Sequence, residues 1–365
     1  MSDQKEEEEK GWSELPSELL YLIAKKLPDL VDFIRFCAVC STWRSSVALS
    51  DRPHQFPWLL ELLERDRFSI LRRRQRFYSV SSGETLIIPF KNKKLKLHSF
   101  IHGEIYSGYL PFADDSGKVL SFFNPLTKDF FSLPSMQYGL GVHWMVWTGS
   151  DPIRKRCIVV VDRDPERMGD LGGCAFYDPS SSKWVETWGY FCNRERCYWQ
   201  GMLFCACINS NIEVFDVHSG KLLHRIPPPK IEWLQSRFNR NSIAQQLRKS
   251  YLVVSSGVIL RVLWFHDFWG KKPVEQSVFH IYRLNYERAE DKFCWDRIDD
   301  IGDEILFFGE MNGFSMTAKP SIGFKKGCIY FIDPKENKPY MHDILAGTVE
   351  RLPCPFEKCA WFLPS

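Results

Sequence analysis

The residues of this sequence that could do metal or redox chemistry are mainly its 12 cysteines. Four pairs are close in the sequence: Cys37 with Cys40, Cys192 with Cys197, Cys205 with Cys207, and Cys354 with Cys359. The first has Cys-x-x-Cys spacing, but it lies in a predicted helix and no second pair matches it in spacing. Cys205 and Cys207 lie two residues apart on a predicted strand, so both thiols face the same side of it. The remaining two pairs have no spacing typical of a metal site. The spacings therefore favour thiols packed in a protein core and predict no metal ion.

Motifs for other catalytic chemistry are absent from the sequence. It contains no Walker-type phosphate loop, no Gly-x-Gly-x-x-Gly, no His-Glu-x-x-His and no Gly-x-Ser-x-Gly. No paired acid and base stands out either. We therefore predict a protein that is not an enzyme, with no catalytic residue and no cofactor.

The net charge and the N-terminal sequence limit which cellular compartment and which classes of partner are expected for this protein. The 48 basic and 45 acidic residues leave a net charge of +3, too balanced for a dedicated nucleic-acid binder. Residues 1–11 are a predicted disordered acidic tail with four consecutive glutamates at 6–9, unlike a signal or transit peptide. No apolar run approaches the roughly 20 residues of a membrane helix. We expect a cytoplasmic or nuclear protein that acts at no membrane.

Residues 12–50 are expected to form three short helices. Pro16 suits a first helical turn, and Leu19, Leu20, Ile23 and Leu27 then recur at three- and four-residue spacing. Pro28 ends this helix, and the following apolar residues indicate two more, which carry Phe33, Phe36, Cys37, Cys40, Trp43 and Val47. Three such helices make only a thin core, so this piece is expected to dock onto something else.

Residues 51–76 are predicted to be a connector that ends in a basic helix or arm, beginning at the apolar residues that follow Trp58. Pro53 and Pro57 interrupt it, and basic residues cluster at 72–76. This cluster is either a solvated arm between domains, which we favour, or a nuclear-import or nucleic-acid segment.

Residues 77–365 are predicted to form one all-β domain. Short apolar and aromatic runs alternate there with turns rich in Gly, Pro, Asn and Asp. A weak repeat places an apolar pair before Asn124, Asp178, Asp216 and Asp333, each followed by a polar turn and another strand. Blades of about 40–50 residues would fill this length with a six- or seven-bladed β-propeller. An ordinary β-sandwich is the alternative.

Two resemblances together span almost the whole chain. Residues 13–47 resemble an F-box. The residues that carry this resemblance are Leu15-Pro16, Glu18-Leu19-Leu20, Ile23, Leu27 and Val39-Cys40-Ser41-Thr42-Trp43-Arg44. The rest of the chain resembles the plant F-box family that has a C-terminal KIB-type β-propeller. The segments that carry this second resemblance are Arg76–Val80, Trp295–Met316, Gly327–Pro334 and Trp361–Ser365.

These resemblances imply a substrate receptor of an SCF-type ubiquitin ligase. The F-box would bind a Skp-type adaptor, and through it a cullin and a RING subunit, while the propeller would bind an unknown target protein. The residues implied in adaptor binding are Leu15, Pro16, Leu19, Leu20, Ile23, Leu27, Val39 and Trp43. The alternative is a non-degradative binding module that inhibits or sequesters a partner such as a kinase.

Overall fold

A computed structural model describes the chain in two compact units, Met1–Pro57 and Trp58–Ser365. The residues described are 11–27, 30–48, 51, 56–62, 74–89, 98–100, 108–114, 118–136, 145–148, 158–162, 172–178, 182–189, 196–207, 210–230, 246–266, 273–287, 292–309, 313–318 and 323–364. None of the helices within these ranges is long and apolar enough to cross a bilayer.

The first unit consists of short helices, as predicted. A single 3-10 turn, η1 (Trp12–Glu14), precedes α1 (Ser17–Lys25), α2 (Leu30–Val39) and α3 (Ser41–Ser45). Pro16 lies just before α1, and its carbonyl accepts hydrogen bonds from the backbone N–H groups of Leu19 and Leu20. The side chains buried on α2 are Leu30, Val31, Phe33 and Phe36.

One detail of the predicted helices is wrong. Cys40 is not in a helix but lies in extended conformation between α2 and α3, where it is the N-cap residue of α3. Its thiol therefore does not share a helical face with Cys37. Helices α2 and α3, on either side of Cys40, pack on each other.

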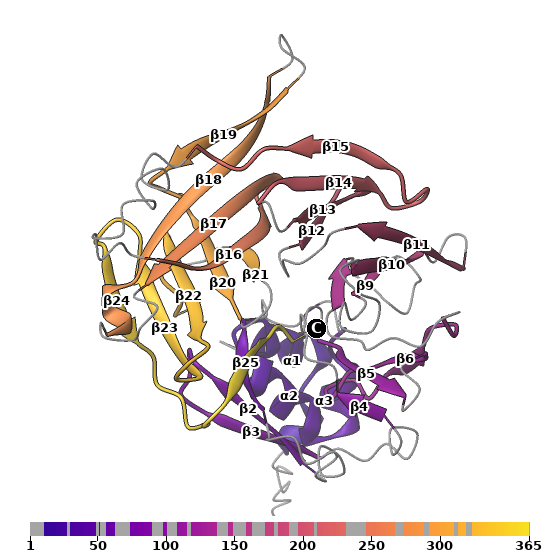
Figure 1. Cartoon of the computed structure of the whole chain (residues 1–365). Coiled ribbons are helices and arrows are strands. Elements are labelled where there is room, and N and C mark those ends of the chain that lie inside the picture. Colours follow the sequence, from indigo (N-terminus) through magenta and orange to yellow (C-terminus); the bar gives the residue numbers. More distant parts are fainter. Residues whose placement is uncertain are drawn as a thin grey trace, which may run out of the picture. The chain divides into compact units, whose positions relative to one another are not determined.

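The second unit is all β and forms a propeller (Figure 1). Its sheets follow each other in chain order around a ring. The first is β25-β1-β2-β3, in which β1 is Trp58–Glu61, β2 Arg74–Ser79, β3 Thr85–Pro89 and β25 Cys359–Phe362. The second is β4 (His98–Phe100), β5 (Leu110–Asp114), β6 (Leu120–Phe123) and β7 (Phe130–Ser132). The third is β8 (Met145–Thr148), β9 (Ile158–Asp162), β10 (Gly172–Asp178) and β11 (Lys183–Gly189).

The remaining sheets complete the ring. The fourth is β12 (Arg196–Trp199), β13 (Met202–Ala206), β14 (Ile212–Asp216) and β15 (Leu222–Ile226). The fifth is β16 (Gln246–Ser255), β17 (Val258–His266), β18 (Val278–Glu287) and β19 (Lys292–Ile298), with the 3-10 turn η5 (Val274–Gln276) before β18. The last has the order β21-β20-β22-β23-β24, formed by β20 (Glu304–Phe308), β21 (Gly313–Thr317), β22 (Cys328–Asp333), β23 (Lys338–Asp343) and β24 (Thr348–Arg351).

This sheet inventory corrects the expectation of six or seven blades, because five of the described sheets have the four-stranded form of a propeller blade. Within the described residues, five sheets have four strands and are antiparallel throughout. The remaining sheet has five strands, because the β20–β21 hairpin lies on its inner side and β20 pairs in parallel with β22. A sequence repeat cannot reveal such an insertion, since β20 and β22 each look like an ordinary apolar strand.

The structure divides the chain ahead of the propeller start predicted at residue 77. The second unit begins at Trp58, because β1 and β2 are strands of the sheet that closes the ring. β1 pairs antiparallel with the C-terminal strand β25, with Trp58 opposite Phe362 and Glu61 opposite Cys359. The side chains of Trp58, Leu59 and Leu60 are buried, so an apolar run that suggested a helix is a core strand instead.

The basic cluster at 72–76 therefore cannot be wholly a solvated arm. Arg76 lies on β2, where its guanidinium forms an ion pair with Glu61 at 3.0 Å and packs over the Phe356 ring at 5.1 Å. Residues 72 and 73 lie outside the described residues.

The predicted repeat corresponds to hairpins with the same turn chemistry. The Oδ1 atom of Asn124, between β6 and β7, accepts the N–H groups of residues 126 and 127. Asp216 between β14 and β15, and Asp333 between β22 and β23, accept hydrogen bonds from following residues in the same way. Asp178 ends β10. Asp343 makes a further turn of this kind before β24.

Candidate adaptor-binding surface and propeller polar network

Helix α1 presents two apolar faces. Leu20 and Ala24, four residues apart, are buried and belong to the core of the first unit. Leu19, Leu22 and Ile23 lie on the neighbouring face at the i, i+3 and i+4 spacing of one helical stripe. Their exposed fractions are 46%, 57% and 37%. We call these three residues the α1 stripe; it leaves large apolar side chains in solvent.

The opposite side of α1 is polar and internally paired. Lys25 forms an ion pair with Asp51 at 3.0 Å and lies over the Tyr21 ring at 5.3 Å. The hydrogen bond with Asp51 raises the pKa of Lys25 above its usual value. The hydrogen bond from the Ala48 N–H, followed by that from Lys25, lowers the pKa of Asp51. Both groups thus stay charged at neutral pH and leave the α1 stripe as the apolar face.

The residues predicted to bind an adaptor divide into three groups in the structure. Leu19 and Ile23 are exposed in the α1 stripe, while Pro16 and Val39 are also exposed. Leu15, Leu27 and Trp43 are half-buried. Leu20 is fully buried, so it supports the helix rather than contacting a partner directly.

Trp43 has a structural role that its sequence position did not reveal. Its ring packs against Phe36 with the ring centroids 4.7 Å apart, and its Nε1–H donates to the carbonyl of Trp12 at 3.1 Å. The neighbouring Arg44 donates from Nε to the Cys37 carbonyl at 3.0 Å, which satisfies a carbonyl in the last turn of α2. The Trp43–Arg44 pair thus joins α3 to α2 and to η1.

Sequence reasoning missed two exposed apolar residues of this unit. Leu22 belongs to the α1 stripe, and its spacing from Leu19 was available as a signal. Trp12, in η1, is 75% exposed, and it precedes the region where a helical period could be read.

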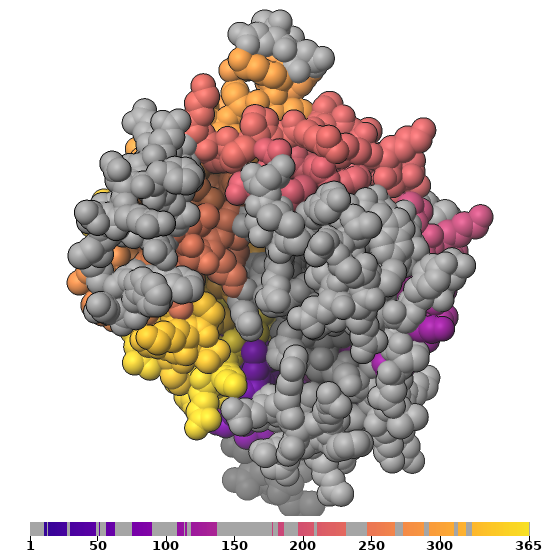
Figure 2. Space-filling view, viewed as in Figure 1, coloured from indigo at the N-terminus to yellow at the C-terminus, as the bar shows by residue number. Residues whose placement is uncertain are grey.

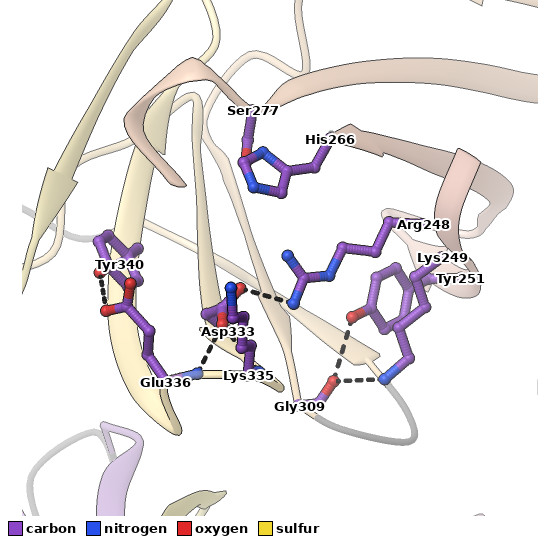
Figure 3. A network of polar contacts seen from close by, with 10 residues as sticks. All are labelled: Arg248, Lys249, Tyr251, His266, Ser277, Gly309, Asp333, Lys335, Glu336 and Tyr340. Carbon is purple, nitrogen blue, oxygen red and sulfur yellow. Dashed lines mark hydrogen bonds and ion pairs between the residues drawn. The ribbon is translucent and has the colours of Figure 1, made fainter. Parts of the chain in front are cut away.

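The propeller contains a polar network between its last two sheets, which lie next to each other in the space-filling view (Figure 2). Figure 3 shows its centre, where Arg248 of β16 points toward Asp333 at the end of β22. Asp333 is fully buried, and its Oδ2 lies 3.0 Å from Arg248 Nη2. The guanidinium also lies over the Trp264 ring, 4.9 Å from its centroid.

A bulge in β16 directs Arg248 to this position. The pairing of β16 with β17 shifts between Leu247 and Lys249, so Arg248 has no partner in the register. Such a bulge re-aims a side chain out of the regular alternation. Lys249 and Tyr251 then both donate hydrogen bonds to the Gly309 carbonyl, at 3.5 and 3.1 Å (Figure 3). The network therefore joins two sheets by charge and hydrogen bonds.

Among the residues that the structure describes, no three His, Cys, Asp or Glu side chains come together as metal ligands. Cys205 and Cys207 both pack in one apolar cluster with Leu203, Phe215 and Val217, as the strand alternation predicted.

Comparison with known proteins places the chain in a family. Residues 77–349 match the model of the KIB1-4 β-propeller family. The chain belongs to this family, as a plant F-box protein with a KIB-type propeller. Its relatives in Arabidopsis thaliana include one named "Putative F-box/kelch-repeat protein", 54% identical over 360 residues that cover 88% of this chain and 87% of the relative.

Two further Arabidopsis thaliana relatives of this F-box protein carry the name "Putative F-box protein". One is 21% identical over 402 residues, covering 97% of both chains. The other is 22% identical over 380 residues, covering 97% of this chain and 93% of the relative. The shared length includes both the helical unit and the propeller.

Proposed function

We propose that this F-box protein is the substrate receptor of an SCF-type ubiquitin ligase. The α1 stripe carries the proposal, because it exposes three large apolar side chains on a unit too small to bury them. A Skp-type adaptor that covers the stripe would remove this surface from water, and the cullin and RING subunit would follow through the adaptor. Val39 and Pro16 would extend the same contact.

The receptor would contribute to ubiquitination by position alone. Its propeller would hold a target protein so that a target lysine lies near a ubiquitin-conjugating enzyme, which raises the effective concentration of the reacting groups. No side chain of this chain needs to act as nucleophile or base. We expect this role in the cytoplasm, the nucleus or both.

The test is a calorimetric titration of the full-length protein with a Skp-type adaptor. We expect sub-micromolar binding by the wild type. Leu19→Ala with Ile23→Ala removes two half-exposed side chains, each worth about 1 kcal/mol when buried. Together they should weaken binding roughly 30-fold. Leu22→Ala should weaken it about fivefold by the same reasoning.

A matched control lies in the propeller. Leu345, in the turn after β23, is 74% exposed, so Leu345→Ala removes the same chemical group from a different unit. It should leave adaptor affinity unchanged. If folded wild-type protein does not bind the adaptor, or if the α1 variants bind as tightly as Leu345→Ala, the receptor proposal fails. The non-degradative module that inhibits or sequesters a partner would then be the better explanation.

A further inference from the structure

A cavity of about 600 Å³ opens between the outer strands of the fourth and fifth sheets of the propeller. One wall is the segment after β15, residues 227–230, and the other is formed by β18 and β19. In Figure 1 the β18–β19 hairpin reaches outward from the ring, with β15 beside it. A cavity of this size is typical of sites that enclose a small molecule or one or two side chains of a larger ligand.

The two walls are fixed to each other. The register of the hairpin places Tyr282 opposite Arg297, and Trp295, two residues before Arg297, lies on the same face of β19. Trp295 donates from Nε1 to the carbonyl of Pro227 at 2.9 Å, which joins the hairpin to the segment after β15. Tyr282 and Pro229 are buried where they line the cavity. The cavity is therefore part of the folded propeller and needs no rearrangement to form.

Apolar and aromatic surface continues from the cavity toward solvent. The Phe293 ring lies 5.1 Å from the ring of His224 on β15 and 5.1 Å from that of Tyr286, which is 48% exposed. β15 is the outermost strand of its sheet, and its Leu222 and Leu223 are 41% and 45% exposed. A free small molecule in the cavity would leave this surface in water. A peptide that extends out of the cavity would cover part of it.

The charge of the cavity favours an acidic ligand. Three of the described residues that line it are cations, Lys230, Lys292 and Arg297, and none of the described lining residues is acidic. Glu287 lies 3.5 Å from Lys292, and Asp299 lies 3.4 Å from Arg297, but these four side chains are 45–87% exposed. Exposed ion pairs contribute little to stability, so a ligand carboxylate can take the place of either acid.

We propose that this cavity binds an acidic peptide segment of a partner protein. An apolar side chain of the segment enters between the proline wall and the rings of Tyr282, Phe293 and Trp295, where its burial supplies affinity. Carboxylates on either side of that anchor face the three lining cations and set the orientation of the segment. The site itself does not depend on ligase activity. Only the identification of the partner as a ubiquitination target rests on the proposed function.

Fluorescence anisotropy with the full-length protein, in the absence of any adaptor, tests the proposal. The probe is the labelled peptide fluorescein-Gly-Glu-Glu-Phe-Glu-Glu, for which we expect saturable binding. Replacing its Phe by Ser should weaken binding about tenfold, because the anchor is lost. Replacing every Glu by Gln should weaken it about tenfold as well, and raising the salt concentration should weaken the acidic probe more than its Gln version.

Variants of the protein locate the site. Arg297→Gln should weaken probe binding about fivefold, and Lys230→Gln should act in the same direction. Arg283→Gln is the matched control, because Arg283 is also an exposed cation of the hairpin but lies next to Tyr282 in the strand, on the opposite face. All three positions are exposed, so unchanged thermal unfolding should confirm that the variants are folded.

Three results would overturn the proposal. The first is the absence of saturable probe binding by the folded wild type. The second is equal affinity for the Ser or Gln peptide, which would assign the probe's binding to charge alone or to apolar contact alone. The third is an equal effect of Arg297→Gln and Arg283→Gln. Because the assay contains no adaptor, any of these results leaves the adaptor titration unaffected, and failure of adaptor binding leaves this site standing.

Discussion

Replacing Asp333 by Asn should destabilise the propeller by removing one charge from between its last two sheets. Asp333 is fully buried, and its Oδ1 accepts the N–H groups of Lys335 and Glu336, each at 2.8 Å. Its Oδ2 faces Arg248 Nη2 at 3.0 Å but accepts no hydrogen bond from the described residues. Asparagine keeps the size of the side chain and an oxygen for the turn. The substitution therefore isolates the ion pair with Arg248.

The size of this destabilisation depends on how deeply Arg248 is buried, because Arg248 keeps its charge when Asp333 is replaced. The Arg248 side chain is only 16% exposed, so its guanidinium would remain mostly desolvated without a counter-ion. Breaking a fully buried ion pair costs about 3–5 kcal/mol. The cost here should be about 2–3 kcal/mol, because the guanidinium keeps some solvent and its contact with the Trp264 ring. For a unit of about 300 residues, that corresponds to a fall in Tm of about 4 °C.

Thermal unfolding followed by circular dichroism and calorimetry measures this effect. Asp303→Asn is the matched control, because Asp303 also pairs with a cation, Lys326 at 2.8 Å, but both side chains are about two-thirds exposed. It should shift Tm by less than about 1 °C. Arg248→Met combined with Asp333→Asn should cost less than the two single changes added together. Equal shifts for Asp333→Asn and Asp303→Asn, or strict additivity, would refute the assignment of the buried pair as a link between sheets.

Two further outcomes are expected. Leu20→Ala should destabilise the helical unit by about 2–4 kcal/mol, because Leu20 is fully buried, whereas Leu22→Ala should leave its helical circular dichroism unchanged. Burial lowers the pKa of His342, so the unfolded chain binds a proton at this residue more readily than the folded protein does. The Tm of the wild type should therefore fall as pH drops below 6.5. The Tm of His342→Asn should fall less steeply over the same pH range.

The turns of the propeller could be predicted because their chemistry is local. Asn124, Asp216 and Asp333 each fold back to accept N–H groups two or three residues later, so their effect is complete within a few residues. A reader of the sequence needs no knowledge of distant strands to recognise them. The repeat they produce is what separates a propeller from a sandwich.

The closure of the ring was not predictable, because it depends on residues about 300 positions apart. β1 is short and apolar, and it is a strand because it pairs with β25 on one side and with β2 on the other.

The adaptor surface shows where sequence reasoning stops on a single helix. An excess of apolar residues on α1 indicated that some must remain outside the core, and the structure bears this out in its exposed side chains. The helical period alone could not say which face is buried, because Leu19 with Ile23 and Leu20 with Ala24 both repeat every four residues. Packing against the other helices makes that choice and buries Leu20 and Ala24. Loss of adaptor binding on changing Leu20 would therefore report unfolding of the unit, and only variants of the α1 stripe test the interface itself.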